Sequence, residues 1–483
     1  MDMGGRVLKR PNAVLLLLVY CGLSNTVISS LGGLLVPSIA RTHHVPVSTA
    51  QWVLTVNLLA GVVTTPVLGR LADGCRSRRA LLAALVLVVS GSVLAAMAGG
   101  LPQLLIGRAL QGPACGMLPM TIALAHRHLA PARVPEGIVV LTVAAATGSG
   151  ISYPLTGLIA DCLDYHWAFW FAVAFVAPAV AGVLLILPPD KGPAADRGAD
   201  AGAPSGFKRA DPVGAVLLTA GLACLLLVVS KGSSWGWTSV AALGPLAGSA
   251  ALIPAWAWWE RRAAQPLIRP DLLLLPDVLL ANITAVVLGA TTFVGYSAIG
   301  MLAQVPPGSG YGLGLSVFTA GCVMLPLSAG SQLAGRLTRR LTARMGHHGM
   351  LPLGGALVAG ANAGLVVHHD RLWHLLLAML AFGVGSSIIW AVVPTLIHTA
   401  VPGDDLGTAT SFNHVLRVAG SAIGSAATGA ILDAYASSDG FPTEEGYVAV
   451  FSVSAISCTA VLLGLLGRVL AERRRAEGSQ LPG

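Results

Sequence analysis

Two arginines within long apolar stretches are the residues of this sequence with the most distinctive chemistry. Gln111 follows Arg108 by three positions, and Arg417 follows His414 and Asn413 by three and four. On a helix these spacings bring the side chains onto one face. A charge inside an apolar helix costs several kcal/mol, so such residues usually face an interior cavity or a polar partner. We therefore expect both clusters to line a polar pathway.

The surroundings of the two arginines leave alternatives open. Asn25, in the first apolar run, is the expected partner of Arg108 from another helix. Three hydroxyl residues continue the face of Arg417 at helical spacing: Ser421, Ser425 and Thr428. They fit a pathway lining and a small-residue seam between helices equally well.

Three further polar or aromatic residues lie in apolar runs. Asn57 and Trp390 lie deep in theirs and fit either the wall of an apolar cavity or a packing role. Trp52 lies near a helix end, where aromatic side chains commonly form the interfacial belt of a membrane protein.

Composition indicates the elements that must position these residues. Apolar residues make up 55% of the 483, charged residues 10%, and the mean hydropathy is +0.76. A soluble domain carries about 25% charged residues, so lipid must be the solvent for much of this chain. Apolar runs of the length needed to cross a bilayer recur near 13–37, 51–68, 81–97, 101–124, 137–158, 167–187, 213–229, 240–259, 278–302, 312–334, 351–367, 372–397, 408–432 and 447–470. The sequence predicts an all-α integral membrane protein with about fourteen transmembrane helices.

Positive charge predicts the orientation, because cytoplasmic loops retain Lys and Arg. With the N-terminus inside and alternating spans, most of the 29 Lys and Arg residues fall in cytoplasmic segments. Only Arg41, Lys231 and Arg371 fall outside. We expect a multi-pass plasma-membrane protein with both termini cytoplasmic. The net charge of +8 then reflects topology and contact with anionic lipid, and no nucleic-acid partner is expected.

Internal repeats predict two halves. Gly69-Arg70-Leu71 recurs as Gly335-Arg336-Leu337, and Gly148-Ser149 recurs as Gly420-Ser421. The expected organisation is an N-terminal six-helix half (1–188), a cytoplasmic linker (189–211), a two-helix insert (212–260), a C-terminal six-helix half (261–471) and a cytoplasmic tail (472–483). No GxxxxGK[ST] phosphate loop is present, so transport driven by ATP is not expected.

Local motifs resemble the major facilitator superfamily, specifically its fourteen-helix drug:proton antiporter branch. The segment from Gly69 to Arg79 is similar to the loop signature G-x-L-a-D-r-x-G-r-k of that family. The residues that carry this likeness are Gly69, Leu71, Asp73 and Arg78, whereas Arg76 replaces the second glycine. Leu104, Arg108, Gln111 and Gly112 match l-x-x-x-R-x-x-q-G in the fourth run. The fifth run keeps Pro154 and Gly157 of the antiporter signature, with Tyr153 and Leu158 in place of glycines.

The resemblance implies a bundle of two six-helix halves with two extra central helices. It implies a bacterial secondary transporter that exports a hydrophobic or amphipathic small molecule, such as an antibiotic, by proton antiport and alternating access. Asp73 and its neighbouring arginines would form a cytoplasmic gate between the halves, the alternative being a plain helix cap. An importer or facilitator on the same fold and a non-transporting membrane scaffold are the alternative functions. We expect no enzyme activity, no cofactor and a monomer.

Proton coupling needs a titratable group, and the 21 Asp and Glu residues all fall in loops or at helix ends. The candidates that remain are Asp73, Asp161, Asp433 and His414. The imidazole of His414 has an ordinary pKa near 6.5, and the adjacent Arg417 would disfavour its protonation.

Metal binding is not expected. The histidine pairs fall in loops, where solvated side chains are the favoured interpretation: His43/His44, His347/His348 and His368/His369. The seven cysteines show no spacing typical of a metal site or a disulfide framework.

Overall fold

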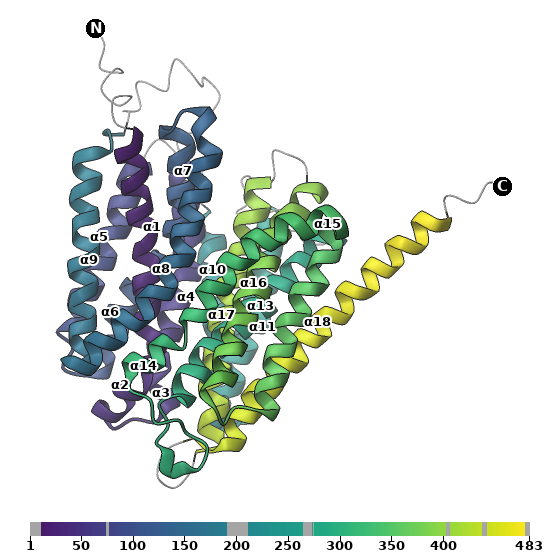
Figure 1. Cartoon of the computed structure of the whole chain (residues 1–483). Helices are drawn as coiled ribbons and strands as arrows, with labels where there is room; N and C mark the ends of the chain where they lie inside the picture. Colours follow the sequence, from purple (N-terminus) through teal and green to yellow (C-terminus); the bar gives the residue numbers. More distant parts are fainter. Residues whose placement is uncertain are drawn as a thin grey trace. The chain divides into compact units, whose positions relative to one another are not determined.

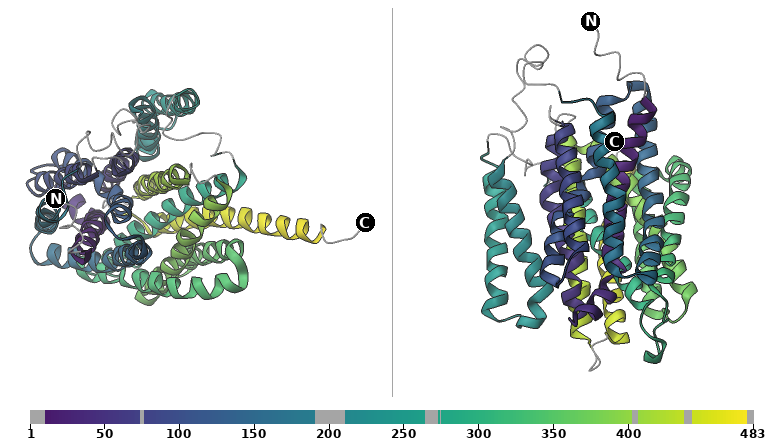
Figure 2. Two further views of the ribbon diagram at one scale, coloured as in Figure 1. Left: turned by 90° about the horizontal axis from the view of Figure 1, so that it is seen from above. Right: turned by 90° about the vertical axis from the view of Figure 1, so that its left-hand side faces the viewer.

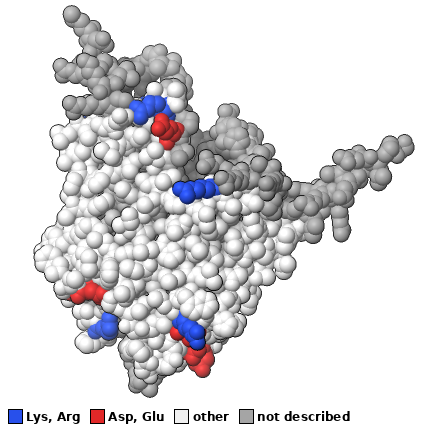
Figure 3. Space-filling view, viewed as in Figure 1, with Lys and Arg blue, Asp and Glu red and all other residues white. Residues whose placement is uncertain are grey.

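The computed structural model describes residues 11–73, 77–190, 211–263, 273, 275–401, 406–436 and 442–478. Regular structure in these ranges is helical, apart from one isolated bridge between Ala436 and Pro442. Twelve helical stretches in this part of the chain are long and apolar enough to cross a membrane. On the face drawn in Figure 3, charged side chains lie near the two ends, and the wide band between them is uncharged. The chain is a multi-pass helical membrane protein.

The chain divides into two compact units. Unit 1 comprises Met1–Arg269 together with the short segment Ser316–Gly321. Unit 2 comprises Pro270–Leu315 and Cys322–Gly483. The two helices of the predicted insert therefore group with unit 1.

Unit 1 begins with long helices that stand side by side (Figure 1). In chain order its elements are α1 (Pro11–Gly33), α2 (Val36–His43), α3 (Val47–Ala50), α4 (Trp52–Asp73), α5 (Ser77–Ala96), α6 (Leu101–Leu110), the 3-10 turn η2 (Gly112–Gly116), α7 (Met117–His128), η3 (Pro131–Arg133), α8 (Val134–Cys162), α9 (Tyr165–Ile186), α10 (Pro212–Trp235) and α11 (Val240–Glu260). Helices α10 and α11 pack on each other as a hairpin, visible at the edge of unit 1 in Figure 2.

Unit 2 contains fewer and longer helices. They are α13 (Pro276–Leu302), the 3-10 turn η4 (Pro307–Ser309), α15 (Leu325–Val367), α16 (Leu372–Ala400), α17 (Leu406–Ala434) and α18 (Glu444–Gly478). Helix α14 (Val317–Cys322) lies where the chain passes through unit 1. In unit 2 the closest helix pairs are α15 with α16 and α13 with α17.

Helical structure follows from the apolar composition, because backbone groups in hydrocarbon must find partners within the same segment. Side-chain caps begin several helices where the chain enters them. Asp164 accepts from the Tyr165 N–H at the start of α9, and Asp211 accepts from two N–H groups at the start of α10. Ser239 accepts from Ala242 at the start of α11. Such caps satisfy N–H groups that have no partner within the helix.

The expected count of fourteen spans is not confirmed, since twelve stretches qualify in the described residues. The fourth expected span is divided into α6, η2 and α7, because Gly112 and Pro113 disfavour a regular helix there. Within α10 the apolar stretch is short, from Val216 to Val229.

The spans expected at 312–334 and 351–367 are both present as apolar stretches, but the connection between them differs from the expectation. They join in the 43-residue helix α15, which has no loop between its two apolar stretches, 317–337 (begun in α14) and 349–367. The arginine-rich segment that we expected to be a loop continues the helix, since it contains no helix-breaking proline.

Candidate functional site

Arg108 is the largest fully buried side chain of the described residues, with 1% of its surface exposed. Its Nε donates to the Val53 carbonyl at 2.9 Å, and its Nη1 donates to the Ile28 carbonyl at 3.1 Å. Nη1 also donates to Gln111 Oε1 at 2.6 Å. The guanidinium thus joins α6 to α1 and α4 through three neutral oxygens. These bonds engage three of the five N–H donors of a buried cation, and all three acceptors are uncharged.

The polar contacts of Arg108 continue into α5. Gln111 Nε2 donates to Ser92 Oγ at 2.8 Å, and Ser92 Oγ donates to the Val88 carbonyl at 2.7 Å. Both residues are fully buried. Arg108 and Gln111, which their spacing placed on one helix face, are hydrogen-bonded to each other. The expected partner Asn25 is half-buried, and the acceptors that α1 and α4 offer to Arg108 are backbone carbonyls, which no sequence motif marks.

Close approach of helices fixes this cluster. A Cβ at Gly112 would lie 2.4 Å from the Ala60 Cβ and 2.9 Å from the Gly61 nitrogen. A Cβ at Gly32 would lie 2.1 Å from a methyl group of Leu54 and 3.1 Å from Arg108 Nη2. Glycine therefore allows α1 to approach Arg108 closely and η2 to pack directly on α4, which keeps the Ile28 and Val53 carbonyls within reach of the guanidinium.

Helix α4 carries two further buried donors. Asn57 has 4% of its surface exposed, and its Nδ2 has no hydrogen-bond partner among the described residues. The indole Nε1 of Trp52 is also buried and unpartnered there. A buried amide that donates no hydrogen bond is costly, which favours the interpretation of Asn57 as a pathway residue that meets water or a ligand.

The antiporter-like motif in α8 packs against the short segment of unit 1 contributed by Ser316–Gly321. Gly157 is buried, and a Cβ there would lie 2.4 Å from the Val317 carbonyl oxygen. A Cβ at Gly321 would lie 2.8 Å from the Tyr153 carbonyl oxygen and 2.9 Å from the Pro154 Cα. Pro154 is half-buried inside α8, which continues through it. The motif is therefore a surface of close backbone contact.

Asp161, at the end of α8, stabilises the contact between α8 and the segment Ser316–Gly321 through hydrogen bonds. Its Oδ1 accepts from the Val317 N–H at 3.0 Å, and its Oδ2 accepts from the Phe318 N–H at 2.8 Å. The carboxylate thus caps the start of α14. From the sequence Asp161 was a candidate for proton coupling, and the geometry shows in addition that it caps a helix distant in sequence.

Hydroxyl pairs join α8 to α1 further along. Ser30 Oγ lies 2.8 Å from Thr156 Oγ1, and Thr26 Oγ1 lies 3.4 Å from Ser152 Oγ. All four side chains are buried. These pairs form a small-residue seam between two helices, a common packing mode in membranes.

In unit 2, α17 brings together the residues predicted from the second cluster. Arg417 and His414 are half-buried, and Arg417 Nη2 lies 2.5 Å from His414 Nδ1. The Arg417 guanidinium lies over the Trp390 ring of α16, 4.8 Å from its centroid. Asn413 Nδ2 donates at 3.0 Å to the Ala281 carbonyl and to Asn282 Oδ1 of α13. The spacing of His414 and Arg417 thus predicted two side chains that are in contact, and Trp390 lies against the same guanidinium, whereas Asn413 bonds to α13.

The hydroxyl stripe of α17 faces a tight helix seam. A Cβ at Gly420 would lie 2.1 Å from the Val286 carbonyl oxygen, and one at Gly289 would lie 2.1 Å from the Arg417 carbonyl oxygen. Ser421 Oγ donates to the Arg417 carbonyl, and Thr428 Oγ1 donates to the Gly424 carbonyl of the same helix. These bonds favour the seam interpretation for the hydroxyl residues.

The expected cytoplasmic gate is described in part. Gly69, Leu71 and Asp73 fall in the last turns of α4, but their side chains lie outside the described residues, as does Arg76 altogether. Arg78 Nη2 donates to the Leu184 carbonyl at 2.8 Å, and so caps the end of α9 from within unit 1.

Sequence reasoning missed the partner of this end of α5. Asp190 accepts from the Arg78 N–H at 3.0 Å and from the Arg79 N–H at 3.1 Å. Its carboxylate therefore caps α5, although the sequence placed it at the start of the linker. The sequence marks Asp190 only as a lone acidic residue directly after Pro188-Pro189. This pattern is too weak to identify a partner more than a hundred residues away in the chain.

Comparison with known proteins agrees with this geometry. The sequence model described as Major Facilitator Superfamily matches residues 15–425. An uncharacterized MFS-type transporter of Mycobacterium tuberculosis is 28% identical over 395 residues, which is 79% of this chain and 54% of that protein. The multidrug resistance protein Stp of the same species is 26% identical over 404 residues, 83% of this chain and 72% of that protein. The chain thus spans about half the length of the first of these relatives.

Solved structures share the fold at low identity. The nucleoside transporter NupG has a TM-score of 0.66 and 13% identity, with 94% of this chain and 99% of that chain covered. The peptide transporter POT has a TM-score of 0.67 and 15% identity, with 95% and 94% covered. A polytopic helical bundle with buried polar clusters is typical of membrane transporters. This chain belongs to the major facilitator superfamily.

Proposed function

We propose that this transporter is a bacterial secondary active exporter of a hydrophobic or amphipathic small molecule, driven by proton antiport. Its two halves would expose a central site alternately to the two sides of the plasma membrane. The proposal includes fourteen spans, cytoplasmic termini, a monomer and a cytoplasmic gate built from Asp73 and the neighbouring arginines. The similarity to proteins named for multidrug resistance supports the class of substrate.

The single observation that carries the proposal is the Arg417 cluster. A half-buried guanidinium lies against an indole ring and an imidazole, on a helix apolar enough to cross the membrane. A buried ionisable side chain in such a helix favours a function in transport. The Trp390 ring, 38% exposed, offers an apolar surface beside the charge, and this combination suits an amphipathic ligand that is neutral or anionic.

The same cluster supplies a mechanism for proton coupling. A guanidinium only donates hydrogen bonds, so the contact between Arg417 Nη2 and His414 Nδ1 requires a His414 that carries no proton on Nδ1. Protonation of Nδ1 would place two N–H groups against each other and release Arg417 from the imidazole. A proton at His414 and a ligand at Arg417 would thereby affect each other, as antiport requires.

Arg108 has a different role in the proposal. Three of its five donors bond to Val53, Ile28 and Gln111 within unit 1, so we assign it the role of ordering the helices around the pathway. Asn57, with its unpartnered buried amide, is the pathway donor that we assign to this unit.

Drug accumulation in efflux-deficient bacteria tests the proposal. Cells that express the protein should accumulate less of at least one amphipathic compound than cells with the empty vector, and a protonophore should abolish the difference. Arg417→Ala and His414→Gln should each lose most of the export. Arg371→Ala is the matched control, because that arginine is 70% exposed outside the spans, and it should export like the wild type.

Other outcomes would identify the alternatives. Higher accumulation in expressing cells would indicate an importer. Accumulation equal to the empty vector across a broad panel, with well-expressed protein, would contradict a multidrug exporter and favour a scaffold.

A further inference from the structure

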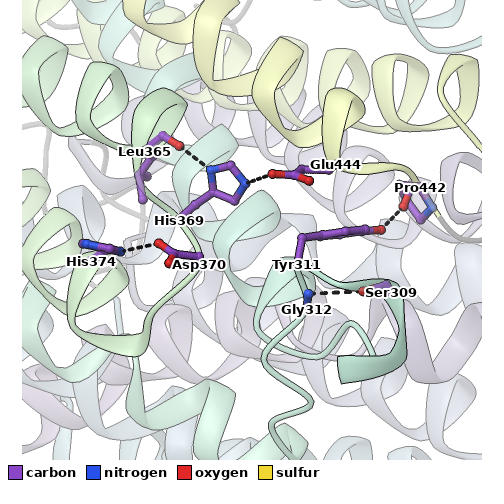
Figure 4. A network of polar contacts seen from close by, with 9 residues as sticks. All are labelled: Ser309, Tyr311, Gly312, Leu365, His369, Asp370, His374, Pro442 and Glu444. Carbon is purple, nitrogen blue, oxygen red and sulfur yellow. Dashed lines mark hydrogen bonds and ion pairs between the residues drawn. The ribbon is translucent and has the colours of Figure 1, made fainter.

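Three side chains at the connection between α15 and α16 gather at one place. His368 follows the last residue of α15, Asp370 lies in the connection, and His374 lies in the first turn of α16. Each offers one nitrogen or oxygen atom, and these atoms all lie within 4.8 Å of one another. Figure 4 shows the His374 ring and the Asp370 carboxylate facing each other.

The environment of His374 suggests an absent partner. Its side chain is 11% exposed, and Nδ1 lies 3.1 Å from Asp370 Oδ1. This nitrogen is shielded from solvent, and among the described residues it has the Asp370 contact but no hydrogen bond of good geometry. The His374 ring is stacked on His368, with centroids 5.3 Å apart, and contacts Trp373 at 3.9 Å. A sheltered imidazole nitrogen beside a carboxylate, with a second imidazole against it, forms a typical donor set for a transition metal.

The neighbouring histidine holds this connection in place. His369 Nδ1 contacts the Leu365 carbonyl at 2.9 Å, and His369 Nε2 contacts Glu444 Oε1 of α18 at 3.1 Å. Both of its ring nitrogens are engaged (Figure 4), so His369 fits the role of an anchor and not that of a metal ligand. The sequence pair His368/His369 therefore separates into one donor and one anchor, and the further donors come from Asp370 and His374.

We propose that His368, Asp370 and His374 bind a divalent first-row transition metal, represented by Zn²⁺, with water completing the coordination. In a tetrahedral zinc site with bonds of about 2.1 Å the donors lie about 3.5 Å apart. Donors within 4.8 Å therefore need to close by roughly 1 Å, which a rotation of the exposed His368 side chain provides. Arg371 Nε lies 3.6 Å from Asp370 Oδ2, leaving Oδ1 as the oxygen that faces His374.

Zn²⁺ binding to the purified full-length protein tests this site independently of transport. The chain must carry no polyhistidine tag, and a chelator removes metal before Zn²⁺ is titrated against a fluorescent competitor. The wild type should bind Zn²⁺ with an affinity that falls at least about tenfold in His368→Ala and in His374→Gln, since loss of a ligand costs at least as much as the loss of an outer-shell partner. His166→Ala is the matched control, because His166 also pairs with a carboxylate, Asp164, at 2.8 Å but belongs to no group of three possible metal ligands among the described residues.

A spectroscopic measurement places the metal. Cu²⁺ quenches tryptophan emission at short range, and Trp373 lies against His374. Quenching should be smaller in His368→Ala and in Trp373→Phe than in the wild type. His368 is exposed, so the His368→Ala protein should fold normally. If His374→Gln misfolds, the result for His368→Ala is the one that tests the site. Wild-type affinity in His368→Ala, or no Zn²⁺ bound by the wild type, would overturn the proposal.

Discussion

A methyl group added at Gly420 would test how closely α13 and α17 approach each other. The added Cβ would lie 2.1 Å from the Val286 carbonyl oxygen and 2.8 Å from its carbonyl carbon and Cα. These are backbone atoms, which cannot rotate away as a side chain would. Ordinary contact begins at 3.4 Å, so the two helices would have to move apart by about 1 Å.

The expected loss of stability is the difference between two effects. Overpacking of a tight interface costs about 1–3 kcal/mol, whereas alanine is favoured over glycine within a helix by about 1 kcal/mol. Gly420→Ala should therefore destabilise the protein by up to about 2 kcal/mol. Its thermal transition in detergent, followed by fluorescence-detected size-exclusion chromatography, should be lower than that of the wild type. Export should fall as well, since α17 carries Asn413, His414 and Arg417.

Gly360→Ala provides the control for this substitution. Gly360 is exposed on α15, and no atom outside its own helix backbone lies within 4 Å of an added Cβ. The same change there should raise the thermal transition, because alanine stabilises an unhindered helix by about 0.4–1 kcal/mol. Equal gains in stability for Gly420→Ala and Gly360→Ala would refute the close approach of α13 and α17.

Three further predictions concern unit 1. Asp190→Ala removes the cap on the Arg78 N–H and should lower stability by about 1 kcal/mol; high salt alone should not reproduce this loss. Asp161→Asn weakens the cap of α14 and should speed maleimide labelling of a lone cysteine kept at Cys322. Burial lowers the pKa of His43 below its ordinary value of 6.5, and the charge of a nearby histidine lowers it further. Neutral His43 therefore contributes to the stability of the fold above pH 6.5, and this contribution is lost as the pH falls through the lowered pKa.

Each of these predictions has a result that would contradict it. An Asp190→Ala protein with wild-type thermal stability would show that the cap is dispensable. If Cys322 is labelled at the same rate in Asp161→Asn and in the control Asp164→Asn, Asp161 does not hold α14 in place. The pH dependence of stability below pH 6.5 should flatten in His43→Gln, and an unchanged profile would assign this pH dependence to other groups.

Much of the fold could be predicted because hydrophobicity acts locally. Runs of about twenty apolar residues must become helices in lipid, and these runs appear in the structure. The break at Gly112-Pro113 was harder to foresee, because its cause lies partly in the packing of η2 on Ala60 of α4. The continuity of α15 was also missed, since a polar segment without proline fits a loop and a helix equally well.

The candidate site could be predicted where partners lie on one helix. The spacings of Arg108 with Gln111 and of His414 with Arg417 identified pairs that are in contact. Partners from other helices could not be identified this way, because backbone carbonyls such as that of Val53 carry no sequence signal. The cation–π contact of Arg417 with Trp390 likewise depends on how α16 packs beside α17.

The most direct test of the central claim is proton-driven export by purified protein in liposomes. With an amphipathic fluorescent substrate, an imposed pH gradient should drive its movement against the proton flux. Arg417→Ala should abolish this movement, and Arg371→Ala should preserve it. Substrate movement that is independent of the pH gradient, or that survives in Arg417→Ala at the wild-type rate, would contradict the account.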